Sequence, residues 1–143
     1  MKISGLLAAK GASVATIAPT ASISEAVEAL GENNVGALVV SATGSSVDGI
    51  ISERDVVRAL RATGAGVLEQ PVSSIMSADV LTCSPGDALD SIMVTMTEHR
   101  IRHVPVIVGA ELAGIVSIGD VVKSRIDELE GDRKALFEYI NAR

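Results

Sequence analysis

Hydrophobic residues along this chain form the same helical pattern twice. In each half, apolar side chains recur at steps of three and four residues, which is typical of a helix with one buried face. The two stripes are Ile23, Ala26, Val27 and Leu30 in the first half, and Leu89, Ile92, Met93 and Met96 in the second. They correspond at a shift of 66 residues, so the sequence predicts an internal repeat in which one design is used twice.

Breaks and β-branched runs indicate the elements around the first stripe. Pro19 stops an initial strand, and Ser22 with Glu25 matches a capping box at the start of a helix. Runs rich in Val and Ile, separated by a turn-rich segment, predict two further strands. The predicted elements are a strand at 15–17, a helix at about 22–32, strands at 35–40 and 47–52, and a helix at about 53–62. The second half repeats this order, so we predict an α+β fold of two units, each strand-helix-strand-strand-helix.

Segments outside the two units complete the predicted organisation. It consists of an N-terminal helix or arm at 1–13, a first unit at 14–62, a connecting segment at 63–79, a second unit at 80–127 and a C-terminal helical extension at 128–143. Apolar residues from Val122 to Ile140 recur at helical spacing, and Gly131 with Asp132 predicts a break that divides this helix in two. The apolar surface either folds back on its own unit or joins two chains. We favour the symmetric contact, and hence a homodimer.

Composition limits the classes of partner. Hydrophobic residues make up 48% of the 143 residues, enough for a packed core, whereas the 1% of aromatic residues supplies no platform for stacking bases. The net charge of −6 also argues against nucleic acid. No uncharged run reaches the ~18 residues of a spanning helix, and Lys10 interrupts the first apolar stretch, so we expect no membrane segment and no signal peptide. The single cysteine, Cys83, indicates a small buried side chain in a reducing compartment, and the expected location is cytoplasmic.

Candidate chemistry lies where the last strand of each unit runs into its last helix. The first junction reads Gly49-Ile50-Ile51-Ser52-Glu53-Arg54-Asp55, and the second reads Gly114-Ile115-Val116-Ser117-Ile118-Gly119-Asp120. Free backbone N–H groups at a helix start favour acceptor-rich ligand groups, and an ionised carboxylate accepts from two hydroxyls at once. Each serine and aspartate pair therefore suits the diol of a ribose. The simpler interpretation is that both pairs are helix caps.

The repeat and its two junctions resemble a tandem pair of CBS (cystathionine beta-synthase) domains, also called a Bateman module, of the stand-alone bacterial signalling type. The resemblance covers about residues 14–130. It implies two units packed with pseudo-two-fold symmetry, three-stranded sheets that face each other, and two clefts for adenosine groups. It further implies that Asp55 and Asp120 bind ribose hydroxyls, and that Ser52 and Ser117 contact ribose or phosphate. The first strand of each unit would frame the adenine, at Thr16, Ile17 and Ala18 and at Thr82, Cys83 and Ser84.

The two halves differ most in the segment before the second strand of each unit. The second unit has basic residues there, among them Arg102 and His103, where the first has the uncharged segment 33–37. A phosphate in a partly desolvated cleft needs donors and positive charge, so we predict that Arg102, His103 and Arg54 bind it. The alternative is a solvated basic loop in which His103 is a packed or capping residue. The asymmetry also allows for only one occupied cleft.

We conclude that the sequence encodes a regulatory, ligand-sensing module that binds an adenosine nucleotide, AMP above all, with NAD or ATP as alternatives. Binding would change its shape or its affinity for a downstream protein. No catalytic motif is present, so we expect no enzymatic activity and no catalytic cofactor. His99 and His103 are four residues apart but are rejected as a metal site, because a strand is predicted to begin beside them. The alternative function is a ligand-free scaffold that acts through its C-terminal helix.

Overall fold

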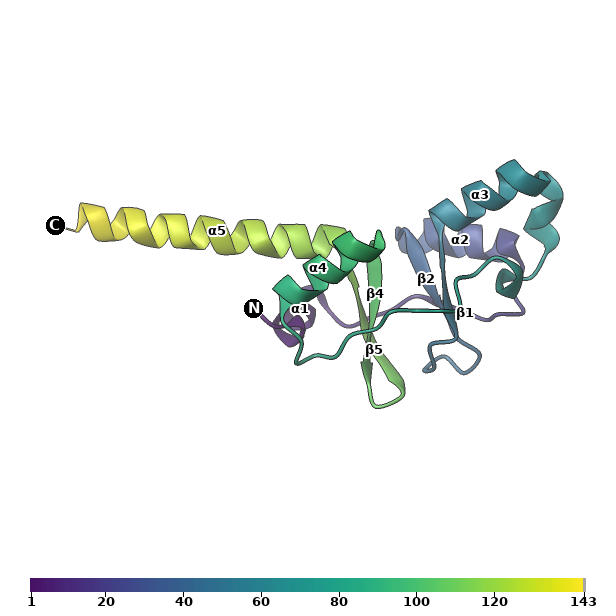
Figure 1. Cartoon of the computed structure of the whole chain (residues 1–143), viewed down its shortest axis with the longest axis horizontal. Helices are drawn as coiled ribbons and strands as arrows, with labels where there is room; N and C mark the ends of the chain where they lie inside the picture. Colours follow the sequence, from purple (N-terminus) through teal and green to yellow (C-terminus); the bar gives the residue numbers. More distant parts are fainter. Residues whose placement is uncertain (143) are drawn as a thin grey trace.

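A computed structural model describes residues 1–142 and shows two units that mix helices and strands, with a long C-terminal helix projecting from the second (Figure 1). The first unit consists of β1 (Thr16–Ile17), α2 (Ile23–Asn33), β2 (Ala37–Val40), β3 (Gly49–Ser52) and α3 (Glu53–Thr63). Its sheet has the order β1-β2-β3, in which β1 runs parallel and β3 antiparallel to β2. The predicted order of strand, helix, strand, strand and helix is therefore confirmed for this unit.

The second unit repeats this order with a much shorter first strand. It consists of α4 (Leu89–His99), β4 (His103–Val108), β5 (Glu111–Ser117) and α5 (Ile118–Asn141). β4 and β5 are antiparallel, and a single residue, Cys83, forms a parallel bridge with Val106 in the place of a β1 counterpart. Cys83 N–H donates to Pro105 O at 3.0 Å, and Ile107 N–H donates to Cys83 O at 2.9 Å. The strand expected around 82–84 is thus reduced to one hydrogen-bonded residue, and the second sheet has two strands.

Three short helices lie outside these units. Two 3-10 helices, η1 (Ala65–Glu69) and η2 (Val72–Ser74), connect the units, and α1 (Ile3–Lys10) precedes the first unit in the chain. α1 packs against the second unit, where Ile3 and Leu6 are buried in the same core as Met96 and Val116. Figure 1 shows the purple helix beside α4, on the side of the molecule from which α5 projects. The segment expected to be an N-terminal helix or arm therefore contributes to the core of the second unit.

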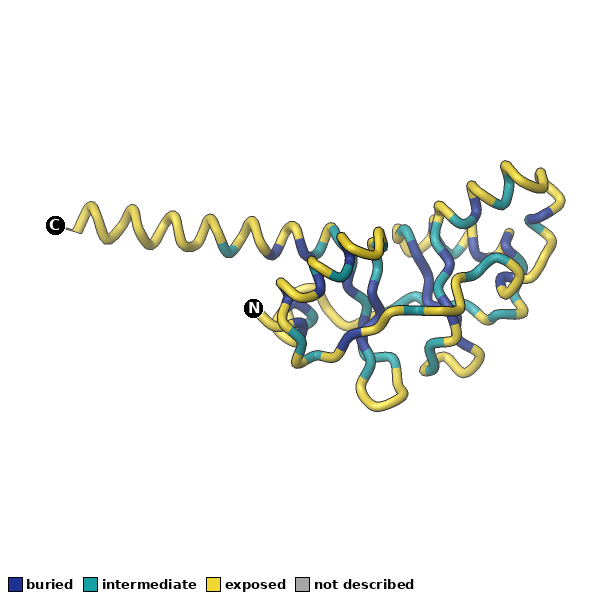
Figure 2. The backbone as a smooth tube through the Cα atoms, viewed as in Figure 1, coloured by how far each residue is buried: buried dark blue, intermediate teal, exposed yellow. Residues whose placement is uncertain are grey.

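Each unit has its own aliphatic core, seen as dark segments in Figure 2. In the first, Ile23 of α2 packs with Leu38 and Ile51 of the sheet, and all three are fully buried. Cys83 belongs to the second core and is 4% exposed. Burial, with a smaller contribution from Asp87, raises the pKa of its thiol to about 11. The expectation of a small buried cysteine is confirmed.

Local capping explains where the helices begin and end. Ser22 Oγ accepts from Glu25 N–H at 3.1 Å, and Ser22 N–H donates to Glu25 Oε2 at 3.2 Å, which confirms the predicted capping box. α2 and α4 end at Asn34 and Arg100, which adopt left-handed conformations with φ of 52° and 54°. Asparagine tolerates this conformation better than arginine does. At Arg100 the left-handed conformation turns the chain sharply into the basic segment that precedes β4.

α5 departs from the prediction in one respect, and the exposure of its apolar residues rules out one of the two alternatives given for them. It is one helix of 24 residues that continues through Gly131 and Asp132; the predicted break is wrong, since one internal glycine costs a helix only about 1 kcal/mol. Its apolar residues also do not fold back, because Ile126, Leu136 and Phe137 are 49%, 60% and 65% exposed and the helix extends away from both units (Figures 1 and 2). Neither α5 nor any other helix within residues 1–142 is long and apolar enough to cross a membrane.

Each repeated junction opens with a glycine, and another segment of the chain lies very close to that glycine. A Cβ atom at Gly49 would lie 2.6 Å from Met76 Sδ and 2.9 Å from Ser77 O, in the connecting segment. A Cβ atom at Gly114 would lie 2.8 Å from Leu7 Cδ2, in α1. The connecting segment therefore covers β3 of the first unit, and α1 covers β5 of the second in the corresponding place.

The Gly49→Ala substitution is expected to destabilise the protein by about 1–3 kcal/mol, because the new methyl group would overlap a backbone oxygen that is paired with β3. Gly31→Ala is a matched control, since nothing lies within 4 Å of a Cβ atom there and alanine stabilises a helix by about 1 kcal/mol relative to glycine. Urea unfolding followed by circular dichroism measures both variants. Equal unfolding midpoints would contradict the close approach at Gly49.

Candidate functional site

A cleft of about 580 Å³ between the two units contains five of the predicted site residues. One wall is the β3–α3 junction of the first unit, and the opposite wall is the segment that precedes and begins β4 in the second. The predicted residues that line it are Ser52, Arg54, Asp55, Arg102 and His103. Residues 64 to 67 positions after Gly36 thus share a cavity with it, because the two units place the starts of β2 and β4 next to each other.

The first wall is built by a capping box. Ser52 Oγ accepts from Asp55 N–H at 3.3 Å, and Asp55 Oδ2 accepts from Ser52 N–H at 2.9 Å and from Ser52 Oγ at 3.0 Å. The interpretation of this pair as a helix cap is therefore correct. Within residues 1–142, no hydrogen bond reaches the other carboxylate oxygen, Asp55 Oδ1. One oxygen caps the helix while the second is available to hydroxyl groups in the cleft.

The opposite wall is strongly basic. Arg100 and Arg102 line it, and Arg54 and Arg58 extend the basic surface from the first turns of α3. In the part of the chain that the structure describes, none of these four guanidinium groups forms an ion pair with a carboxylate. Their donors are therefore available to an anion, and a planar guanidinium suits the oxygens of a phosphate.

His103 lies at the contact between the units. A Cβ atom at Gly36 would lie 3.5 Å from its Cε1 atom. Burial lowers the pKa of His103 below 6.5. The carboxylates of Asp120 and Glu53 act in the opposite direction, and the charges of Lys10 and Arg102 lower it further. The ring is therefore neutral above pH 6.5 in the free protein, and an anion beside it would raise its pKa.

The second junction has the same cap but a different neighbour. Asp120 Oδ2 accepts from Ser117 N–H at 2.9 Å, and Asp120 N–H donates to Ser117 Oγ at 3.1 Å. The same Oδ2 atom also accepts from Lys10 Nζ at 2.6 Å. Burial raises the pKa of Asp120, but the hydrogen bonds from Lys10 and Ser117 outweigh it and lower the pKa below its ordinary value. Asp120 and Ser117 do not line the cleft at Asp55.

The residues expected to frame an adenine lie outside the lining of this cleft. They are Thr16, Ile17 and Ala18 in and after β1, and Thr82, Cys83 and Ser84 around the bridge to β4. Ile50 and Ser77 line the cleft instead, where their backbones exchange two hydrogen bonds of 2.9 Å. Sequence analysis missed Ser77, whose place depends on the path of the connecting segment. Arg58 could have been found, because it follows Arg54 by one helical turn.

Metal binding finds no support in the arrangement of side chains. Over residues 1–142, no three His, Cys, Asp or Glu side chains are grouped so that they could hold a metal ion. His99 ends α4, and its Nδ1 atom lies 3.1 Å from Thr95 O, one turn earlier in the same helix.

Comparison with known proteins gives consistent matches. The family model for the CBS domain matches residues 11–62 and 72–127. A mitochondrial CBS domain-containing protein of Arabidopsis thaliana is 38% identical over 120 residues, which cover 81% of this chain and only 58% of that protein. A CBS-domain protein structure from Agrobacterium tumefaciens has 44% identity and a TM-score of 0.84, and the match covers 87% of this chain and 92% of the other. A CBS domain protein from Pyrobaculum aerophilum, solved in complex with AMP, has 30% identity and a TM-score of 0.75, over 84% of this chain and 89% of the other.

The imidazole of His103 is expected to titrate below pH 6.5 in an NMR titration of the free protein. Glu53→Gln should lower this midpoint further, because it removes a carboxylate that stabilises the imidazolium, and Arg102→Gln should raise it. Because the folded-state pKa is depressed, the unfolded state binds more protons between the two pKa values. The free energy of unfolding should therefore fall as pH drops through that window. A wild-type midpoint above 6.5 would contradict the burial of the ring.

Proposed function

Since the chain belongs to the CBS domain family, we propose that it is a regulatory module that binds an adenosine nucleotide, AMP in particular, in the cleft at Asp55. One observation carries the proposal. Within residues 1–142, a carboxylate with one unbonded oxygen and guanidinium groups without ion-pair partners line the same cavity. Asp55 Oδ1 suits the two hydroxyls of a ribose, and Arg102 with His103 suits the phosphate.

The cavity is large enough for a nucleotide, and a similar protein of known structure points to AMP among the candidates. The cavity of about 580 Å³ is within the range of ~300–1,000 Å³ that is usual for small-molecule sites. The Pyrobaculum protein, 30% identical, was solved with AMP. NAD and ATP present the same adenosine and differ beyond the first phosphate, so they are the competitors that a binding test must include.

The regulatory mechanism that we propose follows from the two-unit construction of the cleft. A nucleotide would contact α3 of the first unit and the start of β4 of the second, so it would favour the relative placement that lets it touch both. A downstream protein that distinguishes this placement would receive the signal. We propose no catalysis, because the site residues bind and orient a ligand without an evident nucleophile. The free, buried Cys83 suits a reducing compartment such as the cytoplasm.

We further propose that α5 joins two chains in a homodimer. Val122, Ile126, Leu129, Leu136 and Ile140 are 45% to 60% exposed, and with Arg133 they recur at alternating steps of four and three residues, the spacing of a coiled-coil seam. Most helices in proteins are stabilised by the packing of an apolar face. The end of α5 has no such packing on its own units, so a second copy of the same seam supplies it.

AMP at about one hundred times its dissociation constant should add about 2.7 kcal/mol to the free energy of unfolding, and raise the melting temperature by several degrees. Asp55→Asn should abolish this shift, because it keeps one oxygen for the helix cap but replaces the other with an NH₂ group. Arg102→Gln should weaken AMP on the order of tenfold and leave adenosine nearly unchanged. Arg61→Gln, an exposed arginine of α3 outside the cleft, is the matched control. No shift with AMP, ATP or NAD would favour the ligand-free scaffold.

Light scattering after gel filtration should give twice the 14.7 kDa mass of one chain. Leu136→Glu should give the mass of one chain, because it places a charge in the proposed seam. Lys134→Glu, a similar change of charge outside the seam, should remain dimeric. A wild-type monomer would mean that α5 contacts a different protein.

A further inference from the structure

We infer that Lys10 closes the second cleft, so that each chain binds one nucleotide at Asp55 and none at Asp120 unless Lys10 is displaced. The inference rests on the proposed function. It concerns the two serine and aspartate pairs, which look alike in the sequence repeat. The strand-helix junctions themselves do not explain a difference between the clefts. Both have the same capping box, with the backbone N–H of the serine 2.9 Å from Oδ2 of the aspartate in each case.

The difference lies in what covers the last strand of each unit. In the first unit, Ser77 covers β3 and its backbone N–H donates to Ile50 O at 2.9 Å. The residue that corresponds to Ile50 in the second unit is Ile115, and its carbonyl oxygen accepts from Lys10 Nζ at 2.8 Å. A side-chain ammonium group therefore occupies the place that a backbone N–H occupies in the first unit.

From this position Lys10 also reaches the carboxylate. Its Nζ atom lies 2.6 Å from Asp120 Oδ2, and the two side chains are 28% and 25% exposed. The first junction has no counterpart, since the 66-residue shift pairs Lys10 with Met76, which carries no charge. Within residues 1–142 neither Asp55 Oδ1 nor Asp120 Oδ1 accepts a hydrogen bond, so the two carboxylates differ in the ammonium group that lies beside Asp120.

α1 holds Lys10 firmly in place. Ile3 is fully buried in the second core, and the backbone N–H groups of Ile3 and Ser4 donate to Asp87 O at 3.0 Å and Pro85 O at 2.8 Å. Leu7 packs closely on β5, since a Cβ atom at position 114 would lie 2.8 Å from Leu7 Cδ2. The ammonium is therefore presented by a fixed helix and does not depend on a flexible arm.

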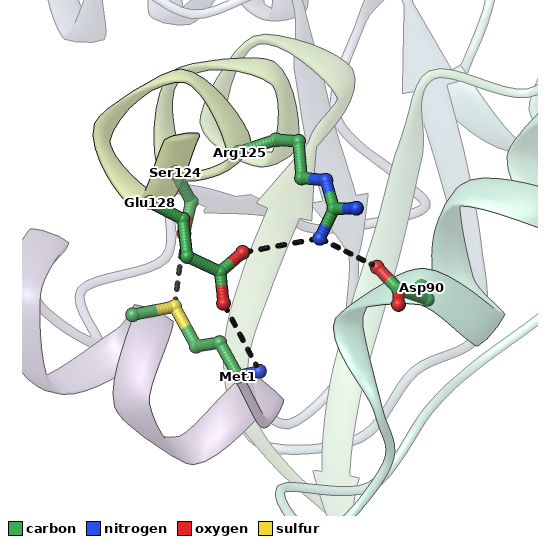
Figure 3. Close-up of polar contacts among 5 residues, drawn as sticks. All are labelled: Met1, Asp90, Ser124, Arg125 and Glu128. Carbon is green, nitrogen blue, oxygen red and sulfur yellow. Dashed lines mark hydrogen bonds and ion pairs between the residues drawn. The ribbon is translucent and has the colours of Figure 1, made fainter. Parts of the chain in front are cut away.

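Polar contacts fix the other end of α1 (Figure 3). Ser124 Oγ donates to Met1 Sδ at 2.9 Å, and Met1 N lies 3.7 Å from Glu128 Oε1. Arg125 bridges Glu128 and Asp90, at 3.2 Å and 3.6 Å. The N-terminal residue before α1 is thus tied to α5, and also to α4, where Leu89 N–H donates to Met1 O at 3.0 Å.

The chemistry of the ribose explains why this contact excludes a nucleotide. A neutral diol at Asp120 would have to share the carboxylate with the ammonium beside Oδ2, or displace that ammonium from a charge-assisted hydrogen bond and leave both charges poorly compensated. The second cleft also lacks a cationic wall, because Arg100, Arg102 and His103 correspond to Asn34, Gly36 and Ala37. A phosphate would therefore gain little to offset the loss of the ion pair.

Isothermal titration with AMP tests the inference through the number of sites per chain. Wild type should bind one AMP. Lys10→Met, which keeps the apolar stem and removes the charge, should bind a second AMP, more weakly than the first because the second cleft has no cationic wall. Asp55→Asn should bind none, and the double variant Asp55→Asn with Lys10→Met should regain one site. Lys2→Met removes an exposed lysine just before α1 and should behave as wild type. Unchanged circular dichroism of Lys10→Met establishes that α1 remains folded.

Each other result has a defined meaning. Two sites in wild type, with one lost in Lys10→Met, would overturn the inference and make Lys10 a phosphate ligand. One site in both wild type and Lys10→Met would also overturn it while leaving the proposed function intact. No binding to wild type but one site in Lys10→Met would support the role of Lys10 and refute the assignment of the Asp55 cleft. No binding to any of the proteins would overturn both proposals.

Discussion

One carboxylate with two oxygens is the constraint on which the cleft depends. Asp55 Oδ2 closes the capping box with Ser52 and so fixes the angle at which α3 leaves β3. Because the cap uses only one oxygen, the other is left without a protein partner within residues 1–142 at no cost to the helix. The helix start and the proposed ligand site are therefore built from the same residues. The two interpretations of the motif, cap and ribose site, do not exclude each other.

The character of each cleft is set by segments from elsewhere in the chain. The cations opposite Asp55 come from the second unit, at Arg100 and Arg102, and the cation at Asp120 comes from α1. A repeat that is nearly symmetric at its motifs can thus have two unequal sites. The net charge does not reveal this difference between the sites. The chain has a net charge of −6, yet four arginines line one cavity. Local arrangement, and not the total, decides whether an anion can bind.

Much of the fold could be predicted because it rests on local rules. Helical stripes, capping boxes and β-branched runs placed the elements of both units, and the repeat placed Asp55 and Asp120 at corresponding junctions. The single-residue bridge at Cys83 could not be foreseen, because strand length depends on pairing partners. The contact of Lys10 was also beyond local reasoning, since it joins residues 110 positions apart. The rule that glycine breaks a helix gave a wrong prediction at Gly131, because the residues around it keep the chain helical.

The path from the cleft to α5 is short. Ser117, which caps α5, is the β-sheet partner of His103, and Ile118 N–H at the start of α5 donates to Arg102 O at 2.8 Å. The residues proposed to bind phosphate therefore hold the first turn of the helix proposed to join two chains. The first unit has the same connection, in which Glu53 N–H donates to Gly36 O at 3.0 Å, but its helix α3 ends within the unit. Only in the second unit does a long rigid helix extend from this connection. A displacement of the segment at Arg102 would thus act directly on the orientation of α5, and a small movement at its base becomes larger toward its end.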